Sequence, residues 1–336
     1  MKYQNKIDFQ AHYLPKAYYD FLEEEGLYCP DGFPTPEWDE VWQQEAMQEL
    51  GISYALLSIS SPSLYTGNKF RSRELARKVN EQGAEIAACS PGNLGFLATL
   101  PLPHVDSSIF EARYCLDELG ADGVGLMTNY GGVYLGDRRL DELMAELDRR
   151  GTLAVMHPTQ PALMISGVNE EIPVPAFEYF TETTRTFLNM VQNDTFTRYP
   201  NIKWVIPHAG AFLPILADRF ESFALMLRFA DPDRRADIME DMAHVYFDAA
   251  GFSEPKQLEM LLRKRTRHAH SLRLRYAVYR HHRLRRAGRG AGADRKAYGR
   301  TEGKTLYRQR ACAFAKVEYE IRMVLSYDSY RTYLPR

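Results

Sequence analysis

Short apolar runs alternate with amphipathic segments along the first three quarters of the chain. The runs are nearly continuous in hydrophobic residues, which is typical of strands covered on both faces. The strands that this pattern predicts are 7–13, 52–59, 94–100, 123–127, 152–156, 204–206 and 245–247. Apolar residues at helical spacing, several times closed by a glycine, fill the intervals between them. The alternation therefore predicts an α/β protein with a parallel sheet.

A (β/α)8 barrel of the TIM type is the architecture that this alternation favours, and a doubly wound open sheet is the structural alternative. The pattern runs through residues 1–264 and then fades. No eighth strand or closing helix is evident after it. We therefore expect a barrel domain over 1–264 whose eighth strand and closing helix are lost, and a separate, anomalous stretch over 265–336.

Composition narrows the class of protein. The chain has 336 residues, 45% of them hydrophobic and 26% charged, with a formal net charge of -2 that favours no polyanionic partner such as nucleic acid. No apolar leader or membrane-length run is found, so we expect no membrane association. The four cysteines show no CxxC spacing, which indicates neither a zinc knot nor a disulfide framework and favours a reducing, cytoplasmic context.

Three histidines and a glutamine lie near or just after the carboxyl ends of predicted strands. Gln10 and His12 are two residues apart, so they share a face of the first strand. His157 follows the strand 152–156 directly, and His208 comes just after 204–206. In a parallel barrel the carboxyl ends of the strands meet at one mouth. Any one of these histidines alone is as well explained by local hydrogen bonds, but their equivalent positions favour a common metal-binding and catalytic site.

The residues around these histidines resemble a known family. The motifs are Ile7-Asp8-x-x-Ala11-His12-x-x-Pro15, His157-Pro158-Thr159, and Pro207-His208-Ala209-Gly210 followed by Leu213-Pro214. Together, over about 6–262, they resemble the amidohydrolase-related group that contains aminocarboxymuconate-semialdehyde decarboxylase and gamma-resorcylate decarboxylase. The resemblance implies a TIM-type barrel with one divalent metal, usually zinc or manganese. It also implies nonoxidative carbon–carbon lyase or hydrolase chemistry, commonly in a homodimer.

Carried over by position, the resemblance makes Gln10, His12 and His157 metal ligands and His208 the residue that moves a proton. The sequence departs from the family in two places. Gln10 stands where the family has His or Glu, and a neutral amide oxygen is a poorer ligand for a transition metal. The family's Gly-Ser/Thr-Asp-x-Pro motif, which supplies the last ligand, is missing. Asp248 is the nearest acid at a predicted strand end, but the family does not use that position.

The activity that the resemblance implies is decarboxylation of a small aromatic or dienoic carboxylic acid, with zinc as the first candidate metal and manganese as the second. A divalent cation chelates a carboxylate or activates water, and a histidine delivers or takes the proton. Hydrolysis of an amide, ester or lactone is the alternative. The long segment 158–200 is expected to form a lid or a dimer contact and to offer Arg185 to a substrate carboxylate. Alternatively, Arg185 is a solvated helix residue.

Basic residues dominate the chain from Arg265 to Lys296, where Asp294 is the only acid. A polyanion-binding arm on an inactive barrel is one interpretation, and histidine-rich metal binding is another. Translation in the wrong frame explains more. If the codons are read one base later from Arg265, the free choice of third bases allows the peptide VPDTPILYGSDMPYT. This peptide restores the eighth strand and the Gly-Ser-Asp-x-Pro motif. In the same shifted frame, the codons of residues 305–316 allow the peptide LYTGNALALLQK, which resembles a closing helix. The codon of Val317 then allows a stop. We expect weak metal retention and little turnover from the polypeptide as it stands.

Overall fold

The computed structural model describes residues 6–230, 237–253 and 256–264. It also describes three two-residue strands, β10 (Arg273–Leu274), β11 (His281–His282) and β12 (Tyr319–Glu320). Apart from these six residues, the stretch 265–336 lies outside the described part of the chain, and so do the structural predictions made for it.

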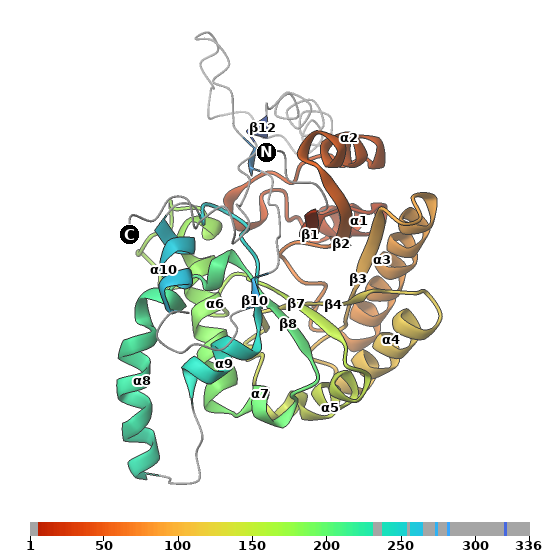
Figure 1. Ribbon diagram of the computed structural model, residues 1–336. Coiled ribbons are helices and arrows are strands. Elements are labelled where there is room, and N and C mark those ends of the chain that lie inside the picture. Colours follow the sequence, from red (N-terminus) through yellow and green to blue (C-terminus); the bar gives the residue numbers. More distant parts are fainter. Residues whose placement is uncertain are drawn as a thin grey trace.

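Eight parallel strands form one curled sheet, ordered β1-β2-β3-β4-β7-β8-β9-β10 (Figure 1). The first seven are β1 (Lys6–His12), β2 (Ile52–Ser58), β3 (Leu94–Thr99), β4 (Gly123–Met127), β7 (Leu153–His157), β8 (Lys203–Ile206) and β9 (Tyr246–Phe247). Each strand lies next to its successor in the chain, whereas a doubly wound sheet reverses direction at a switch point. The order is that of a barrel wall, so the predicted barrel-type fold is confirmed and the open alternative is not adopted.

The strand expected to be lost is represented by β10, in which Arg273 pairs with Tyr246 and Leu274 with Phe247 of β9. Within the described residues, the sheet runs from β1 to β10 without a ladder joining these two end strands. The described wall is therefore open between its first and last strands.

Helices cover the outer face of this wall (Figure 1). They are α1 (Lys16–Glu24), α2 (Glu40–Leu50), α3 (Lys69–Cys89), α4 (Val105–Asp117), α5 (Asp141–Arg150), α6 (Val174–Gln192), α7 (Thr195–Arg198), α8 (Leu213–Ala230), α9 (Ile238–His244) and α10 (Lys256–Lys264). A small hairpin of β5 (Asn129–Tyr130) and β6 (Val133–Tyr134) follows β4.

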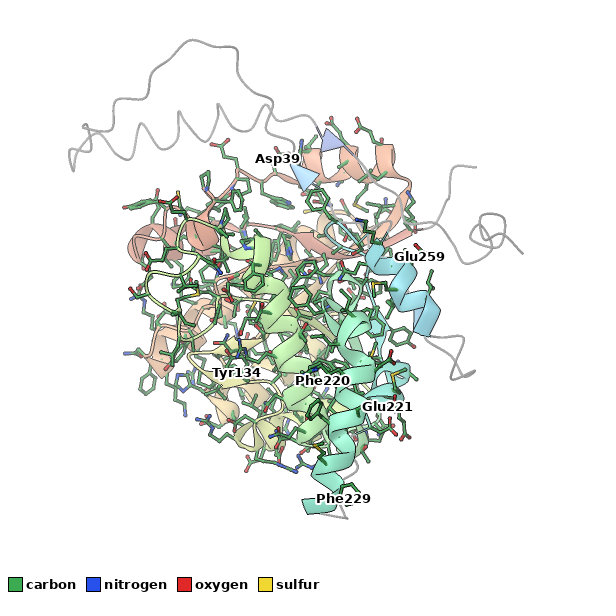
Figure 2. All side chains as sticks on the ribbon, turned by 90° about the vertical axis from the view of Figure 1, so that its left-hand side faces the viewer. Asp39, Tyr134, Phe220, Glu221, Phe229 and Glu259 are labelled. Atoms are coloured by element: carbon green, nitrogen blue, oxygen red, sulfur yellow. The ribbon has the colours of Figure 1, made fainter. Side chains whose placement is uncertain are left out.

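Figure 2 shows Phe220 and Glu221 along α8 and Phe229 at its far end. Within the described ranges, no helix has the length and apolar character needed to cross a bilayer.

Thr35 and Pro36, which together are a typical start of a helix, stand a few residues before α2. The helix nevertheless begins at Glu40. The cap is Asp39, whose carboxylate accepts a hydrogen bond from the backbone N–H of Trp42. A carboxylate at this position satisfies one of the free N–H groups of the first turn and interacts favourably with the helix dipole, so it competes well with threonine.

A buried apolar layer fills the inside of the wall beneath its carboxyl-terminal mouth. It consists of one side chain from each of five strands, namely Phe9, Leu56, Leu97, Val155 and Val205. On β1, Ala11 belongs instead to the cluster under the helices. The pairing of β1 with β2 shifts register between Asp8 and Ala11, and the Asp8 carboxylate accepts the Gln10 N–H at 2.8 Å. This bulge changes the alternation, so Gln10 and His12 face the mouth directly above the Phe9 layer.

A buried ion pair between α3 and α4 leads to a stability prediction. Glu111 is fully buried and accepts hydrogen bonds from the Arg77 guanidinium (2.8 Å) and the Asn80 amide (2.9 Å). Arg77→Met leaves a buried charge without its partner, so we expect a loss of about 3–5 kcal/mol in the free energy of unfolding, measured in urea. Lys69→Met, which removes the exposed pair with Asp106, is the control and is expected to cost at most about 1 kcal/mol. Equal losses of unfolding free energy in Arg77→Met and Lys69→Met would contradict the conclusion that the buried pair stabilises the fold more than the exposed pair.

A buried carboxyl on α9 makes stability depend on pH. Burial, with the negative charges of Asp237, Glu240 and Asp194, raises the pKa of Asp241 to about 8. The folded state then holds a proton that the unfolded state releases, so this group lowers stability as pH rises from about 4 to about 8. Asp241→Asn is expected to raise the free energy of unfolding increasingly over that window, by up to about 1.4 kcal/mol per pH unit, and the unfolding temperature with it. Thermal unfolding at pH 5 and pH 8 tests this.

The control for Asp241→Asn is Glu142→Gln, which neutralises an exposed carboxylate in the first turn of α5. This control should leave the pH dependence of the unfolding temperature as it is in the parent chain. A stabilisation by Asp241→Asn that is the same at pH 5 and pH 8 excludes a raised carboxyl pKa as its cause.

Candidate active site

The carboxyl ends of β1, β7 and β8 bring the predicted residues together. His12 and His157 lie edge to face, with ring centroids 4.6 Å apart and an interplanar angle of 86°. The Gln10 side chain reaches across to Asp248, whose carboxylate also binds the backbone N–H of His208. The predicted convergence at one mouth is thus present in the fold, and the role of each residue stays a prediction.

The three imidazoles are neutral at physiological pH. Burial lowers the pKa of His12 to about 4 and that of His208 to about 4. It lowers the pKa of His157 well below the usual 6.5, and the nearby positive forms of His12 and His208 add to this effect. Neutral imidazole is the form that binds a metal and the form that accepts a proton. Burial at the mouth therefore keeps all three rings in the form that can bind a metal or accept a proton.

Polar ring atoms without partners mark the site. The Nδ1 atoms of His157 and His208 are buried and have no hydrogen-bond partner among the described residues. Buried polar atoms are nearly always paired in native proteins, so such atoms indicate a place where a ligand binds. A small cavity adjoins His157 and is lined by Gln10, Ser58, Ile59, Leu97, Thr99, Gly125, Met127, Val155 and His157.

A complete metal site is not formed by these residues. Within the described ranges, no group of three or more His, Cys, Asp or Glu side chains is placed to hold a metal ion. The Nε2 of Gln10 donates to Asp248 at 2.9 Å and to the Met156 carbonyl at 3.4 Å, so only its amide oxygen is left as a ligand atom. Two imidazoles and one neutral oxygen supply no negative charge to offset a divalent cation. The described donor set therefore falls short of the one that the resemblance implies.

His208 lies in an unusual turn. His208, Ala209, Gly210 and Ala211 all have positive φ, at 57°, 49°, 81° and 53°. Only the glycine adopts such a conformation without strain, and non-glycine residues held there cost about 1–3 kcal/mol each. Ala211, with ψ at -119°, is in a region that is disfavoured for any residue with a Cβ. Strong local contacts must therefore hold this turn in place.

Asp248, at the end of β9, is the main such contact. It is fully buried, and its Oδ1 accepts the N–H groups of His208 (2.8 Å) and Ala250 (3.0 Å). Burial raises the pKa of Asp248 to about 6. From the other side, the side-chain amide of Gln257 on α10 donates to the carbonyls of His208 and Ala211. Gln257 was missed by the sequence analysis, since a helical glutamine carries no signal that it reaches a distant turn.

Helix α6 covers the mouth. Phe180 stacks on the His208 ring with centroids 5.2 Å apart, and Tyr179 lies 5.6 Å from the His157 ring. The Tyr179 hydroxyl donates to Asp31 at 2.8 Å, in the segment that precedes α2. The long segment 158–200 thus includes a cover for the site, as expected of a lid. Asp31 was not singled out in the sequence, because its contact with α6 spans 148 residues.

Arg185 has a protein partner. Its side chain is 55% exposed, and its Nε donates to the Glu182 carboxylate at 2.8 Å. Glu182 is fully buried and also accepts from the Asn129 amide at 3.1 Å. Arg185 therefore pairs within its own helix while more than half of its side chain remains exposed, and the alternative of a solvated helix residue stays open. Its predicted contact with a substrate carboxylate stays a prediction.

Comparison with known proteins decides the family. The amidohydrolase family model Amidohydro_2 matches residues 7–259. The chain belongs to the amidohydrolase family. It is 34% identical to a 6-methylsalicylic acid decarboxylase of Aspergillus aculeatus over 268 residues, which cover 77% of this chain and 80% of that protein. It is 26% identical to a gamma-resorcylate decarboxylase of Rhodococcus jostii, over 65% of this chain and 71% of that one. The predicted family is confirmed, and with it an enzyme.

Solved structures agree on the fold of this amidohydrolase. A crystal structure described as an amidohydrolase superposes with a TM-score of 0.75 and 38% identity, covering 81% of this chain and 86% of that one. A 5-carboxyvanillate decarboxylase from Sphingomonas paucimobilis superposes with a TM-score of 0.71 at 16% identity, covering 82% and 88%. At that identity the second likeness shows the fold alone.

Proposed function

We propose that this amidohydrolase is built to decarboxylate a small aromatic carboxylic acid without an oxidant. The observation that carries the proposal is the group of buried, neutral histidines under an aromatic cover. It lies in a chain whose relative at 34% identity is a 6-methylsalicylic acid decarboxylase. A dienoic acid is the second substrate class, since a 2-amino-3-carboxymuconate-6-semialdehyde decarboxylase of Dictyostelium discoideum is 27% identical over 64% of this chain.

In this proposal His208 carries the proton. Loss of CO2 from an aromatic carboxylate leaves an electron pair on the ring carbon, and one proton must arrive there to give the neutral ring. The unpartnered Nδ1 of His208 is the atom that we assign to hold that proton. Phe180, stacked on the ring, fixes its plane and excludes water from one face. Because burial keeps the His208 ring neutral at rest, the ring must first take up one proton, from solvent or from the acidic group of the substrate. Its low pKa then favours release of that proton to carbon.

A divalent metal is part of the proposal, with zinc first and manganese as the alternative. A dihydroxybenzoic acid decarboxylase from Polaromonas with bound manganese shares the fold at 18% identity. In this chain Gln10, His12 and His157 are the proposed ligands, but the described donor set is incomplete. For that reason we derive no step through the metal from these residues alone.

A reading-frame change after Lys264 explains the missing ligand. The shifted reading places Gly-Ser at the codons of Arg273 and Leu274, which form β10, and the aspartate at the codon of Arg275. The restored motif thus falls where the sheet has its eighth strand. The nucleotide sequence around the Lys264 codon tests this directly. A one-base insertion or deletion in an open frame supports the proposal, whereas stop codons in the shifted frame before residue 316 refute it.

A homodimer and a cytoplasmic location complete the proposal. The segment between β7 and α6 exposes large apolar side chains, among them Leu163 at 89% and Ile165 at 72%. Such a patch next to a catalytic mouth is typical of a protein–protein contact. Sedimentation velocity of the chain and of a Leu163→Ser/Ile165→Ser variant tests it, since only the variant should run as a monomer.

The activity itself is tested with a panel of substrates. The frame-restored protein, loaded with zinc or manganese, is incubated with 6-methylsalicylate and other hydroxybenzoates while CO2 release is measured. Amide, ester and lactone substrates are run in parallel, and hydrolysis without CO2 release makes the hydrolase alternative the better one. Salt-sensitive DNA binding that is lost on truncation before Arg265 would instead support an inactive barrel with a polyanion-binding tail.

A further inference from the structure

Asp248 joins three elements of the site through one buried carboxylate. Its Oδ2 accepts the Gln10 amide of β1 at 2.9 Å, and its Oδ1 accepts the His208 N–H at 2.8 Å. The backbone carbonyl of Asp248 also accepts the Ala209 N–H at 2.9 Å. The carboxylate therefore fixes the first residue of the left-handed turn and ties it to the strand that carries His12.

Gln257 holds the same turn from α10. Its Nε2 donates to the carbonyls of His208 and Ala211, the first and last residues with positive φ. Asp248 accepts from the turn's N–H groups and Gln257 donates to its carbonyls. Asp248 accepts the His208 N–H through its carboxylate and the Ala209 N–H through its backbone carbonyl, so Asp248 and Gln257 satisfy complementary halves of the same backbone. Nothing in the intrinsic preference of histidine or alanine favours this conformation, so these contacts must supply what stabilises it.

We infer that Asp248 and Gln257 are positioning residues that hold His208 in its left-handed turn, and that Gln10 is the partner through which Asp248 ties this turn to β1. The inference rests on the proposed function only where it takes His208 as the proton carrier. It also accounts for a glutamine at position 10. An amide donates a hydrogen bond to the buried Asp248 carboxylate, whereas a second carboxylate there would repel it.

Hydrogen exchange of the full chain tests the clamp. Asp248→Ala and Gln257→Ala are each expected to speed amide exchange of residues 208–211 at least about tenfold, with smaller changes elsewhere. Asn80→Ala is the matched control, because Asn80 is also fully buried and bonds the backbone of Thr99. It should speed exchange around β3 and leave 208–211 unaffected. Unchanged exchange at 208–211, or a rise of equal size in all peptides, overturns the inference.

An exchange of partners tests the role of Gln10 and remains usable if Asp248→Ala does not fold. Gln10→Glu sets two carboxylates against each other and is expected to lower the unfolding temperature. Adding Asp248→Asn lets the new amide at position 248 donate to the new carboxylate at position 10. The double variant is therefore expected to recover most of the lost unfolding temperature. Additive losses in the double variant contradict a direct pair.

The imidazole signals of His208 show whether the clamp positions the ring as well as stabilising the fold. The spectra are recorded on chain labelled with 15N-histidine, and the His208 signals are assigned as those that disappear in His208→Asn. These signals should shift in Asp248→Asn and in Gln257→Ala. They should return to their parent positions in the Gln10→Glu/Asp248→Asn variant. Signals that stay constant in all of these variants refute a positioning role. None of these measurements uses turnover, so failure of the frame-restored, metal-loaded chain to decarboxylate refutes the proposed function and leaves this inference standing.

Discussion

A chain whose residues from 265 onward follow the shifted reading is expected to retain a divalent metal through gel filtration and to decarboxylate its substrate. The polypeptide as it stands should do neither to a comparable degree. The restored aspartate adds the negative charge that Gln10, His12 and His157 lack. The restored residues also occupy the eighth strand, which the two-residue β10 represents in the described wall. Since even outer partners of a metal site change affinity 10–100-fold, we expect metal to bind at least about 100-fold more tightly. Metal content by mass spectrometry and CO2 release measure the two effects.

The matched control is the restored chain with alanine at the new aspartate. It keeps the eighth strand and loses the carboxylate, so it separates closure of the wall from completion of the metal site. We expect this control to fold as well as the restored chain and to lose most of the bound metal. If the polypeptide as it stands already binds metal as tightly as the restored chain, the account of a missing ligand is wrong.

In the restored enzyme, His208→Asn is expected to lower kcat by about 10²–10⁴-fold, the range typical of a lost general acid or base. Metal content and the KM of the substrate should change little, because in this proposal His208 moves a proton and does not bind the metal. Steady-state kinetics with metal analysis measures all three quantities. His244→Asn is the control, since His244 is exposed on α9 and bonds only the Pro200 carbonyl among the described residues. A small loss of kcat with a large loss of metal would make His208 a ligand instead.

The order of strands and the location of the site followed from the sequence alone. Continuous apolar runs separated by helical spacing indicate parallel strands, and strands joined by a helical crossover usually lie beside one another. Histidines directly after such runs must then lie at one edge of the sheet. Gln10 and His12 share a face because side chains alternate along a strand. These features depend on local periodicity and on chain direction, both of which can be read from residue order.

The tertiary structure decided how the site is held and what it lacks. The bulge in β1 depends on the Asp8 contact and on pairing with β2, and it sets the face on which Gln10 and His12 lie. The neutral state of the histidines arises from their burial, and the left-handed turn of His208 depends on Asp248 and Gln257. Arg185 meets Glu182, a pairing that the sequence analysis did not anticipate. Most of these features come from contacts between elements far apart in the chain or from burial, and such contacts leave no periodic trace in the sequence.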